Sequence, residues 1–234
     1  MKRSGLMLAA FAAITIVITG CSKSGDTKAP ASEPAAGRGA AVGTGGAGAN
    51  LKSDAEFVKD VASKNMAEIE LSRIALDKAT SPEVKVFAQM MVDDHGVAGN
   101  KLKTVISGQP VEAQLDDKHR ETADELSKKQ GADFERDYLE AMVHGHEDLA
   151  AKLESRLDVQ SLADWKTAAA GRTQNKALPE PTVAMRDVQV RPATSDNEIT
   201  MKINQWAAET YPVAQKHLDT ARTLENAAKK RSTN

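Results

Sequence analysis

The residues in this sequence best suited to chemistry are three histidines and one glutamate that interrupt apolar helical patterns. They are Glu68, His95, His146 and His217. Imidazole nitrogens and carboxylate oxygens are common protein ligands of zinc, iron, manganese and copper. If the four segments that carry them lie side by side, the sequence predicts one mid-bundle layer that binds a single divalent metal ion.

A buried polar network without a metal ion is the alternative interpretation of these four residues. A histidine on an apolar helix face is more often a hydrogen-bonded core residue, and Glu68 could pair with a protonated histidine. An unpaired buried carboxylate is costly, so both interpretations require a partner for Glu68. The neighbouring Asp94 and Glu147 are candidates to orient two of the histidines, whereas His144 is predicted to face solvent.

The positions of these residues follow from four long segments with helical periodicity. Apolar residues recur at alternating spacings of three and four over residues 53–79, 82–107, 133–157 and 196–230. Each metal-capable residue lies within about 6 Å of the middle of its helix, at 1.5 Å per residue. Antiparallel packing would therefore bring the four side chains to one level. Three glycines near that level predict either close helix contact or room for a small ligand: Gly96, Gly99 and Gly145.

Local signals mark the ends of these helices. Capping-box patterns at residues 53–56 and 195–198 predict the starts of the first and last helices. Ser81 followed by Pro82 predicts the start of the second helix. Pro212 is expected to kink the last helix, because proline removes one backbone hydrogen bond and clashes with the preceding turn.

The remaining parts of the helical domain, which is predicted to span residues 53–230, are shorter. Weaker helices are predicted at 115–129 and 162–170. Residues 172–194 contain three prolines and no clear period, and they are interpreted as a long loop or an insertion, with a short strand at 188–190. The expected fold class is therefore all-α, a four-helix bundle with extra short helices.

The N-terminus carries the features of a lipoprotein signal peptide. Lys2 and Arg3 precede an apolar run over residues 6–18, which is too short to span a bilayer as a helix. The run ends in Ile-Thr-Gly before Cys21, a pattern that resembles the bacterial lipobox, whose cysteine is lipidated. Ser22 at the next position resembles the signal for sorting to the outer membrane.

These features predict that residues 1–20 are removed and that Cys21 is lipidated. A plain signal peptide with an incidental cysteine is the alternative. Residues 21–52 are rich in Ala, Gly and Pro and are predicted to form a disordered tether before the helical domain. The expected location is the outer membrane of a bacterial cell envelope, with the domain in the periplasm. The membrane is then a partner through lipidated Cys21.

The composition excludes several classes of protein. The 234 residues carry 31 Lys and Arg against 33 Asp and Glu, a net charge of −2, so nucleic acid is not an expected partner. The single cysteine excludes an intramolecular disulfide and a cysteine-based zinc cluster. The chain has no phosphate-binding loop and no nucleophile-elbow motif. No catalytic residue and no organic cofactor is therefore predicted.

Several motifs resemble those of a bacterial family, the domain of unknown function 4142. The residues that carry the resemblance are 57–58, 68–72, 84–92 with Asp94 and His95, 134–139 with His146, and 211–212 leading to His217 and Leu218. Their order and spacing match over residues 53–157 and 197–228. Residues 158–196 depart from the usual family length, so the resemblance implies an insertion there before the last helix. The resemblance implies a ferritin-like bundle that is exported to the cell envelope, often as a lipoprotein, and whose biochemical role is uncharacterised.

The chain departs from the di-iron pattern of ferritin-like proteins. Those proteins place a glutamate three residues before a histidine on two helices, whereas this chain has Val92 and Val143 in the corresponding positions. A carboxylate-rich oxidase centre is therefore disfavoured, and a single-metal, histidine-rich site is expected. A non-enzymatic structural or interaction module with a metal-free core is the alternative function.

Overall fold

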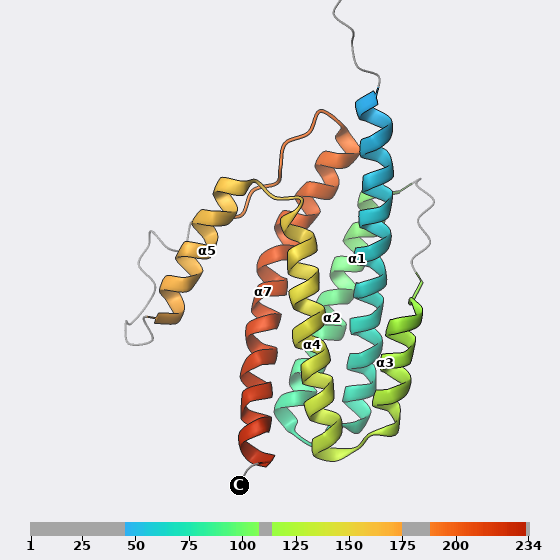
Figure 1. The fold of residues 1–234 in the computed structure, drawn as a ribbon, viewed down its shortest axis with the longest axis vertical. Coiled ribbons are helices and arrows are strands. Elements are labelled where there is room, and N and C mark those ends of the chain that lie inside the picture. Colours follow the sequence, from blue (N-terminus) through green and yellow to red (C-terminus); the bar gives the residue numbers. More distant parts are fainter. Residues whose placement is uncertain (1–44, 108–113, 175–187, 233–234) are drawn as a thin grey trace, which may run out of the picture. The chain divides into compact units, whose positions relative to one another are not determined.

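The computed structural model describes residues 45–107, 114–174 and 188–232, which form six α-helices. They are α1 Gly45–Lys78, α2 Pro82–Val105, α3 Asp117–Lys128, α4 Gly131–Glu154, α5 Val159–Gln174 and α7 Glu198–Ser232 (Figure 1). Within these ranges no strand is present, and a single antiparallel bridge joins Leu157 to Pro192. The predicted all-α fold class is confirmed. The strand predicted at 188–190 does not form, because the neighbouring chain here is the end of a helix and not another strand.

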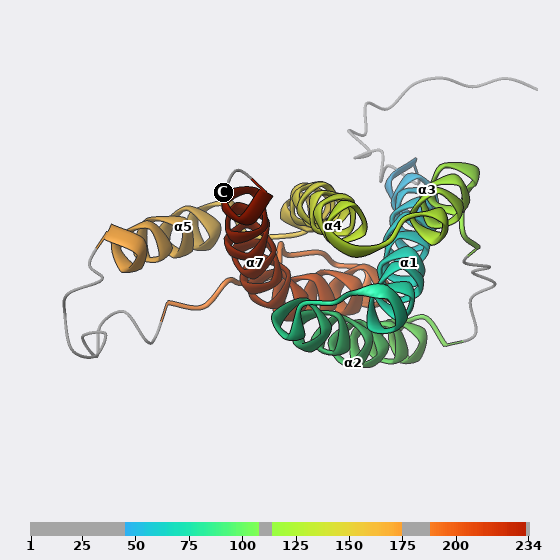
Figure 2. The ribbon, with the colours of Figure 1, turned by 90° about the horizontal axis from the view of Figure 1, so that it is seen from below.

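The four long helices α1, α2, α4 and α7 pack side by side, and α3 lies against α1 (Figures 1 and 2). Helix α1 contacts α2 and α4, and α7 contacts the same two helices. Helices α1 and α7 run in one direction, whereas α2 and α4 run in the other (Figure 1). The chain between α2 and α4 must therefore return along the bundle, and α3 belongs to this crossover. A single long crossover is also a feature of ferritin-like bundles.

Two apolar clusters fill the bundle. One includes Phe57 and Trp206, and the other includes Phe134 and Tyr138. Each long helix contributes apolar residues to both clusters. Between the residues that enter one cluster and those that enter the other, each helix carries a buried polar residue. These polar residues are Glu68, His95, His146 and His217. The layer predicted from the sequence therefore separates the two halves of the core.

Helix α1 starts earlier than predicted. It begins at Gly45, so residues 45–52, which the composition assigned to the disordered tether, are helical. The capping-box pattern therefore lies inside the helix. Asp54, within this pattern, is buried, accepts a hydrogen bond from the Thr200 hydroxyl at 2.6 Å and pairs with Arg156. These contacts join this turn to α7 and to the segment after α4, so the pattern here serves contacts between segments and not a helix start.

The starts of the other predicted helices lie closer to expectation. Helix α2 begins at Pro82, and the Ser81 side chain accepts a hydrogen bond from the backbone of the first turn, as predicted. At the start of α7 the cap is Asn197 and not Ser195, the first residue of the predicted capping box: the Asn197 side chain accepts the backbone N–H of Thr200 at 3.0 Å, and the helix begins at Glu198. Pro212 lies inside α7, and in Figure 2 the orange and red parts of this helix run in different directions, as a kink requires.

Some sequence predictions concern residues that the structure does not describe. The signal peptide at 1–20, lipidated Cys21 and the tether up to residue 44 are among them, as is the part of the insertion at 175–187. The described part of the insertion contains α5, which extends beyond the predicted 162–170 at both ends. Of the helices in the described ranges, none is both long enough and apolar enough to cross a membrane.

Candidate metal centre

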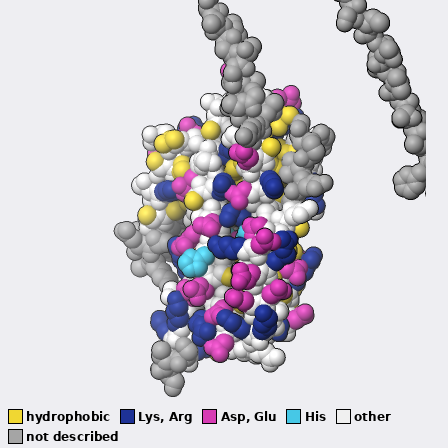
Figure 3. All heavy atoms as spheres, turned by 45° about the vertical axis from the view of Figure 1, so that its right-hand side comes forward, with side chains coloured by type: hydrophobic (Ala, Val, Ile, Leu, Met, Phe, Trp, Pro, Cys, Tyr) yellow, Lys and Arg dark blue, Asp and Glu magenta, His cyan; other side chains and the backbone are white. Residues whose placement is uncertain are grey.

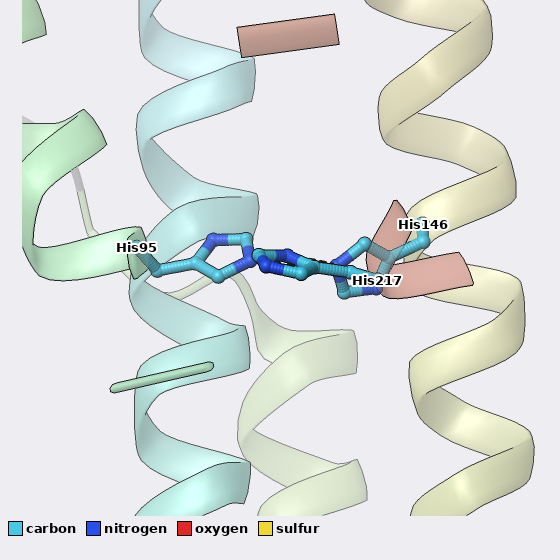
Figure 4. A group of neighbouring side chains, drawn as sticks. All are labelled: His95, His146 and His217. Atoms are coloured by element: carbon cyan, nitrogen blue, oxygen red, sulfur yellow. Dashed lines mark hydrogen bonds between the residues drawn. The ribbon is translucent and has the colours of Figure 1, made fainter. Parts of the chain in front are cut away.

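Three histidines from three different helices meet between the two apolar clusters. His95 lies on α2, His146 on α4 and His217 on α7 (Figure 4). Their exposed fractions are 5%, 0% and 1%, so all three rings are removed from solvent. The three histidines therefore lie in one layer, as the helix midpoints predict.

One nitrogen of each ring points toward the other two rings. His146 Nε2 lies 3.4 Å from His95 Nε2 and 3.4 Å from His217 Nδ1. The three candidate ligand atoms all lie within 4.8 Å of one another, and each pair of ring centroids is 5.4 Å apart. In the described part of the chain, no other three His, Cys, Asp or Glu side chains bring their ligand atoms so close together.

The other nitrogen of each ring faces a hydrogen-bond acceptor. His146 Nδ1 lies 2.8 Å from the backbone carbonyl oxygen of Met142, one helical turn earlier. His217 Nε2 lies 2.9 Å from a carboxylate oxygen of Asp94. Because a carbonyl or an ionised carboxylate can only accept, the outer nitrogen of each ring must carry the hydrogen.

His95 is oriented in the same way by Asn65 of α1. Asn65 Oδ1 accepts a hydrogen bond from His95 Nδ1 at 3.1 Å. A Cβ on Gly99 would lie 2.9 Å from Asn65 Nδ2, so the glycine leaves the room that the amide needs. Sequence reasoning missed Asn65, although it lies three residues before Glu68 and therefore on the same helix face. All three rings thus carry their hydrogen on the outer side.

Burial favours the neutral form of two of the rings, His95 and His217. Loss of contact with water lowers the pKa of His95 despite the nearby Glu68 charge, and lowers the pKa of His217 to about 4 despite Asp94. At pH 7 each of these rings has a single hydrogen, which lies on its outer nitrogen. Three nitrogen lone pairs then converge in a core of low polarity, where their mutual repulsion is poorly screened. A bound cation would replace this repulsion with attraction.

Glu68 lies beside the histidines but outside their shared centre. Its Oε2 lies 3.0 Å from His95 Nδ1 and its Oε1 lies 3.4 Å from His146 Nδ1, which are the outer nitrogens of both rings. Neither oxygen has an aligned hydrogen bond, although the residue is only 3% exposed. The structure therefore differs from the prediction that Glu68 is a fourth ligand, because α1 places the carboxylate against the outer edges of the rings.

Gly145 provides the space for this carboxylate. A Cβ at Gly145 would lie 2.9 Å from Glu68 Oε1, whereas a Cβ at Gly96 would meet nothing within 4 Å. Gly145 and Gly99 therefore make room for side chains that flank the histidine rings. This differs from both reasons that the sequence suggested, close helix contact and room for a small ligand.

Of the two carboxylates expected to orient histidines, only one does so. Asp94 accepts the N–H of His217. Glu147 instead pairs with Arg222 at 2.6 Å on the surface. His144, whose side chain is 70% exposed, faces solvent as predicted.

The sequence matches a known protein family over much of its length. The family, described as Domain of unknown function (DUF4142), matches residues 40–176, which is more than half of the chain. No curated protein and no solved structure matches the chain. The matched range contains His95 and His146 and ends before α7, the helix that supplies His217.

Proposed function

Because the chain belongs to the family Domain of unknown function (DUF4142), whose description names no activity, we propose a function from its own residues. We propose a metal-binding lipoprotein of the cell envelope, in which His95, His146 and His217 hold one divalent transition-metal ion. The observation that carries the proposal is that the outer nitrogen of every ring faces a hydrogen-bond acceptor, which assigns the ring hydrogen to the outer side. It leaves three unprotonated nitrogens converging in a buried centre.

The spacing of these nitrogens supports a tetrahedral ion such as zinc. Zinc binds imidazole nitrogen at about 2.0–2.1 Å, so two nitrogens on one tetrahedral ion lie roughly 3.3–3.4 Å apart. Two of the three nitrogen pairs in this centre are 3.4 Å apart, and the third pair, between His95 and His217, lies within 4.8 Å. Copper and iron also accept imidazole ligands, whereas manganese prefers oxygen. We expect zinc and copper to bind more tightly than iron, and manganese to bind most weakly.

The groups around the rings support the same proposal. Metal-binding histidines nearly always donate their other N–H to a carboxylate, a carbonyl or water, which fixes the ring and makes the ligating nitrogen more basic. Asp94 and the Met142 carbonyl accept such bonds here. The carboxylates of Glu68 and Asp94 lie 3.0 Å and 2.9 Å from the outer nitrogens of His95 and His217, so they add negative charge beside the rings that would hold the cation. Three protein ligands leave one position of a tetrahedral ion available to water or another small ligand.

The proposed location rests on the N-terminal sequence. The lipobox-like residues before Cys21 support lipid attachment at that cysteine, and the apolar run at 6–18 supports export. Lipid attached to Cys21, followed by the chain up to residue 44, would hold the helical domain outside the bilayer. We propose the outer membrane as the point of attachment and the periplasm as the compartment of the domain.

Metal content and thermal unfolding of the purified protein test the proposal. Protein purified without chelator should contain one metal ion per chain. The metal-free protein should melt at a higher temperature as the Zn²⁺ concentration rises, because the ion binds only the folded state. His146→Ala should abolish this rise. His144→Ala is the matched control on the same helix and should keep it, because the His144 side chain is 70% exposed.

A metal-free core would support the alternative function. If Zn²⁺, Cu²⁺, Fe²⁺ and Mn²⁺ all leave the melting temperature unchanged, metal binding is rejected. The histidines would then form a buried polar network in a structural or interaction module. The two 3.4 Å contacts between ring nitrogens support a metal-free network only if one nitrogen of each pair carries a hydrogen and donates it to the other. The lowered pKa values of His95 and His217 oppose this additional hydrogen at neutral pH.

A further inference from the structure

A cavity of about 350 Å³ lies between α1, α3 and α4 and reaches Glu68. Exposed side chains such as His144 and Asp148 line its outer part, and the buried residues Glu68 and Met142 line its inner part. Figure 3, with the side of α1 and α3 turned forward, shows basic and acidic side chains intermingled on this face. Glu68 therefore links a polar cavity to two of the three histidines.

The Glu68 carboxylate lacks the hydrogen bonds that a buried charge needs. The N–H groups of both neighbouring rings point to other acceptors, so neither carboxylate oxygen has an aligned donor. A buried carboxylate in this state is costly in a folded protein. Its Oε1 lies against Gly145, which also lines the cavity. The carboxylate is therefore placed to interact with a ligand that arrives through the cavity.

The charge of the cavity lining favours a cation as that ligand. Five carboxylates and three lysines line the cavity, a net formal charge of −2 when the histidines are neutral. Two of the lysines are engaged by lining carboxylates, since Lys64 lies 3.7 Å from Asp148 and Lys129 pairs with Asp137. A cleft with an excess of one charge raises the local concentration of ions of the opposite sign.

A second cavity near the histidines lacks this character. It has a volume of about 220 Å³, lies between α1 and α2 and touches His95. Its lining contains apolar side chains such as Met66 and Ile69, one lysine and no carboxylate. A hydrated cation gains no oxygen ligand with negative charge there, so this cavity is a poor path for a metal ion.

We infer that the cavity between α1, α3 and α4 is the path by which the metal ion reaches the histidines, and that Glu68 receives the hydrated cation at its inner end. The inference rests on the proposed function. Among the described residues only the three histidines gather as a ligand group, so a cation at Glu68 keeps most of its water and is held briefly. It then exchanges that water for the converging ring nitrogens.

The rate of metal uptake by the metal-free, full-length protein tests this path. Co²⁺ is the probe, because its visible absorption reports binding to a tetrahedral nitrogen site directly. Glu68→Gln removes the charge at the inner end while keeping the shape of the side chain. Because electrostatic attraction raises association rates by at least about tenfold, we expect the association rate constant of Glu68→Gln to fall by about that factor or more.

A second variant blocks the cavity without changing the histidines or Glu68. Thr122 lines the cavity from α3, and Thr122→Trp fills it with a large ring. Because an obstruction slows passage in both directions, the association and dissociation rate constants should fall by the same factor. The dissociation constant for Co²⁺ should stay unchanged.

Two matched variants separate the path from general effects. Glu70→Gln removes a carboxylate of α1 that lines neither cavity, and Met66→Trp fills the apolar cavity at His95. Both should take up Co²⁺ at the wild-type rate. If both Glu68→Gln and Thr122→Trp take up Co²⁺ at the wild-type rate, the proposed path is overturned while the metal centre stands. The same conclusion follows if Met66→Trp is the one variant that slows uptake. A wild-type protein that binds no Co²⁺ would reject the proposed function and the path together.

Discussion

Replacement of Asp94 by alanine shows whether the acceptors around the histidines matter for metal binding. The Asp94 carboxylate accepts the Nε2–H of His217 at 2.9 Å and so determines which ring nitrogen faces the centre. In Asp94→Ala the ring can rotate or change tautomer, and its Nδ1 is no longer held toward the metal ion. We expect the affinity for zinc to fall while the stoichiometry remains one ion per chain.

The exposure of Asp94 sets the expected size of this effect. Loss of the outer hydrogen-bond partner of a metal-binding histidine costs about 10–100-fold in affinity, or roughly 1.4–2.7 kcal/mol. The His217 side chain is 2% exposed, but that of Asp94 is 45% exposed, so water can replace the carboxylate as acceptor. We therefore expect the lower end of the range, about tenfold or roughly 1.4 kcal/mol.

Competition with a chelator of known zinc affinity measures this change. Asp93→Ala is the matched control, because Asp93 is exposed on the same helix and accepts a hydrogen bond from Gln89 at 2.9 Å instead of from a histidine. The control should bind zinc as the wild type does. Equal zinc affinity of Asp94→Ala and the wild type would refute the role assigned to the outer acceptors.

Three further predictions concern stability and location. In the metal-free protein the pKa of His217 is about 4, against about 6.5 in an unfolded chain, so the unfolded state takes up this proton first as the pH falls. The contribution of His217 to the free energy of unfolding should therefore be fully present above about pH 6.5 and fall by roughly 3 kcal/mol by about pH 4. Urea unfolding should show this loss in the wild type and a smaller loss in His217→Gln. Gly96→Ala should raise the stability measured by thermal unfolding by up to about 1 kcal/mol, because the new Cβ meets nothing within 4 Å. Gly145→Ala should lower it despite the same gain in helix propensity, because the new Cβ would lie 2.9 Å from Glu68 Oε1, and equal gains from both substitutions would contradict the packing described here. Cys21→Ala should abolish acyl labelling and move the protein from the membrane fraction to the soluble periplasmic fraction, and unchanged labelling would contradict the proposed anchor.

Helix periodicity predicted where along the bundle the histidine layer lies, because this position depends on local sequence spacing alone. Apolar residues at spacings of three and four define the buried face of each helix, and His95, His146 and His217 lie on these faces. The constant rise per residue then fixes their height along the bundle. These two quantities bring together side chains that are 51 and 71 residues apart in the sequence.

The roles of the surrounding side chains depend on details that periodicity does not fix. Whether Glu68 meets the inner or the outer nitrogens of the rings is decided by the rotation of α1 against α2 and α4. The choice of Asn65 as the acceptor for His95 depends on the same contact. The one local indication of these flanking side chains was the presence of Gly99 and Gly145 inside helices. Glycine there costs about 1 kcal/mol relative to alanine, which suggests that a neighbouring side chain occupies the space of a Cβ.

The first helix shows where composition misleads. The Ala- and Gly-rich residues before position 53 predict a disordered chain, yet α1 begins at Gly45. The capping-box pattern at 53–56 is a local signal, and a long-range contact replaces it, since Asp54 bonds Thr200 of α7 and pairs with Arg156. Contacts between segments 146 residues apart cannot be seen in a local pattern.

X-ray absorption at the zinc K-edge decides whether the three histidines hold a metal ion, because it reports the type, number and distance of the ligands. For the zinc-loaded protein we expect nitrogen or oxygen ligands at about 2.0–2.1 Å, with the outer-shell scattering of three imidazoles. His217→Ala should lose the scattering of one imidazole. Zinc surrounded by oxygen alone, or no zinc retained after dialysis, would contradict the assignment of His95, His146 and His217 as a metal centre.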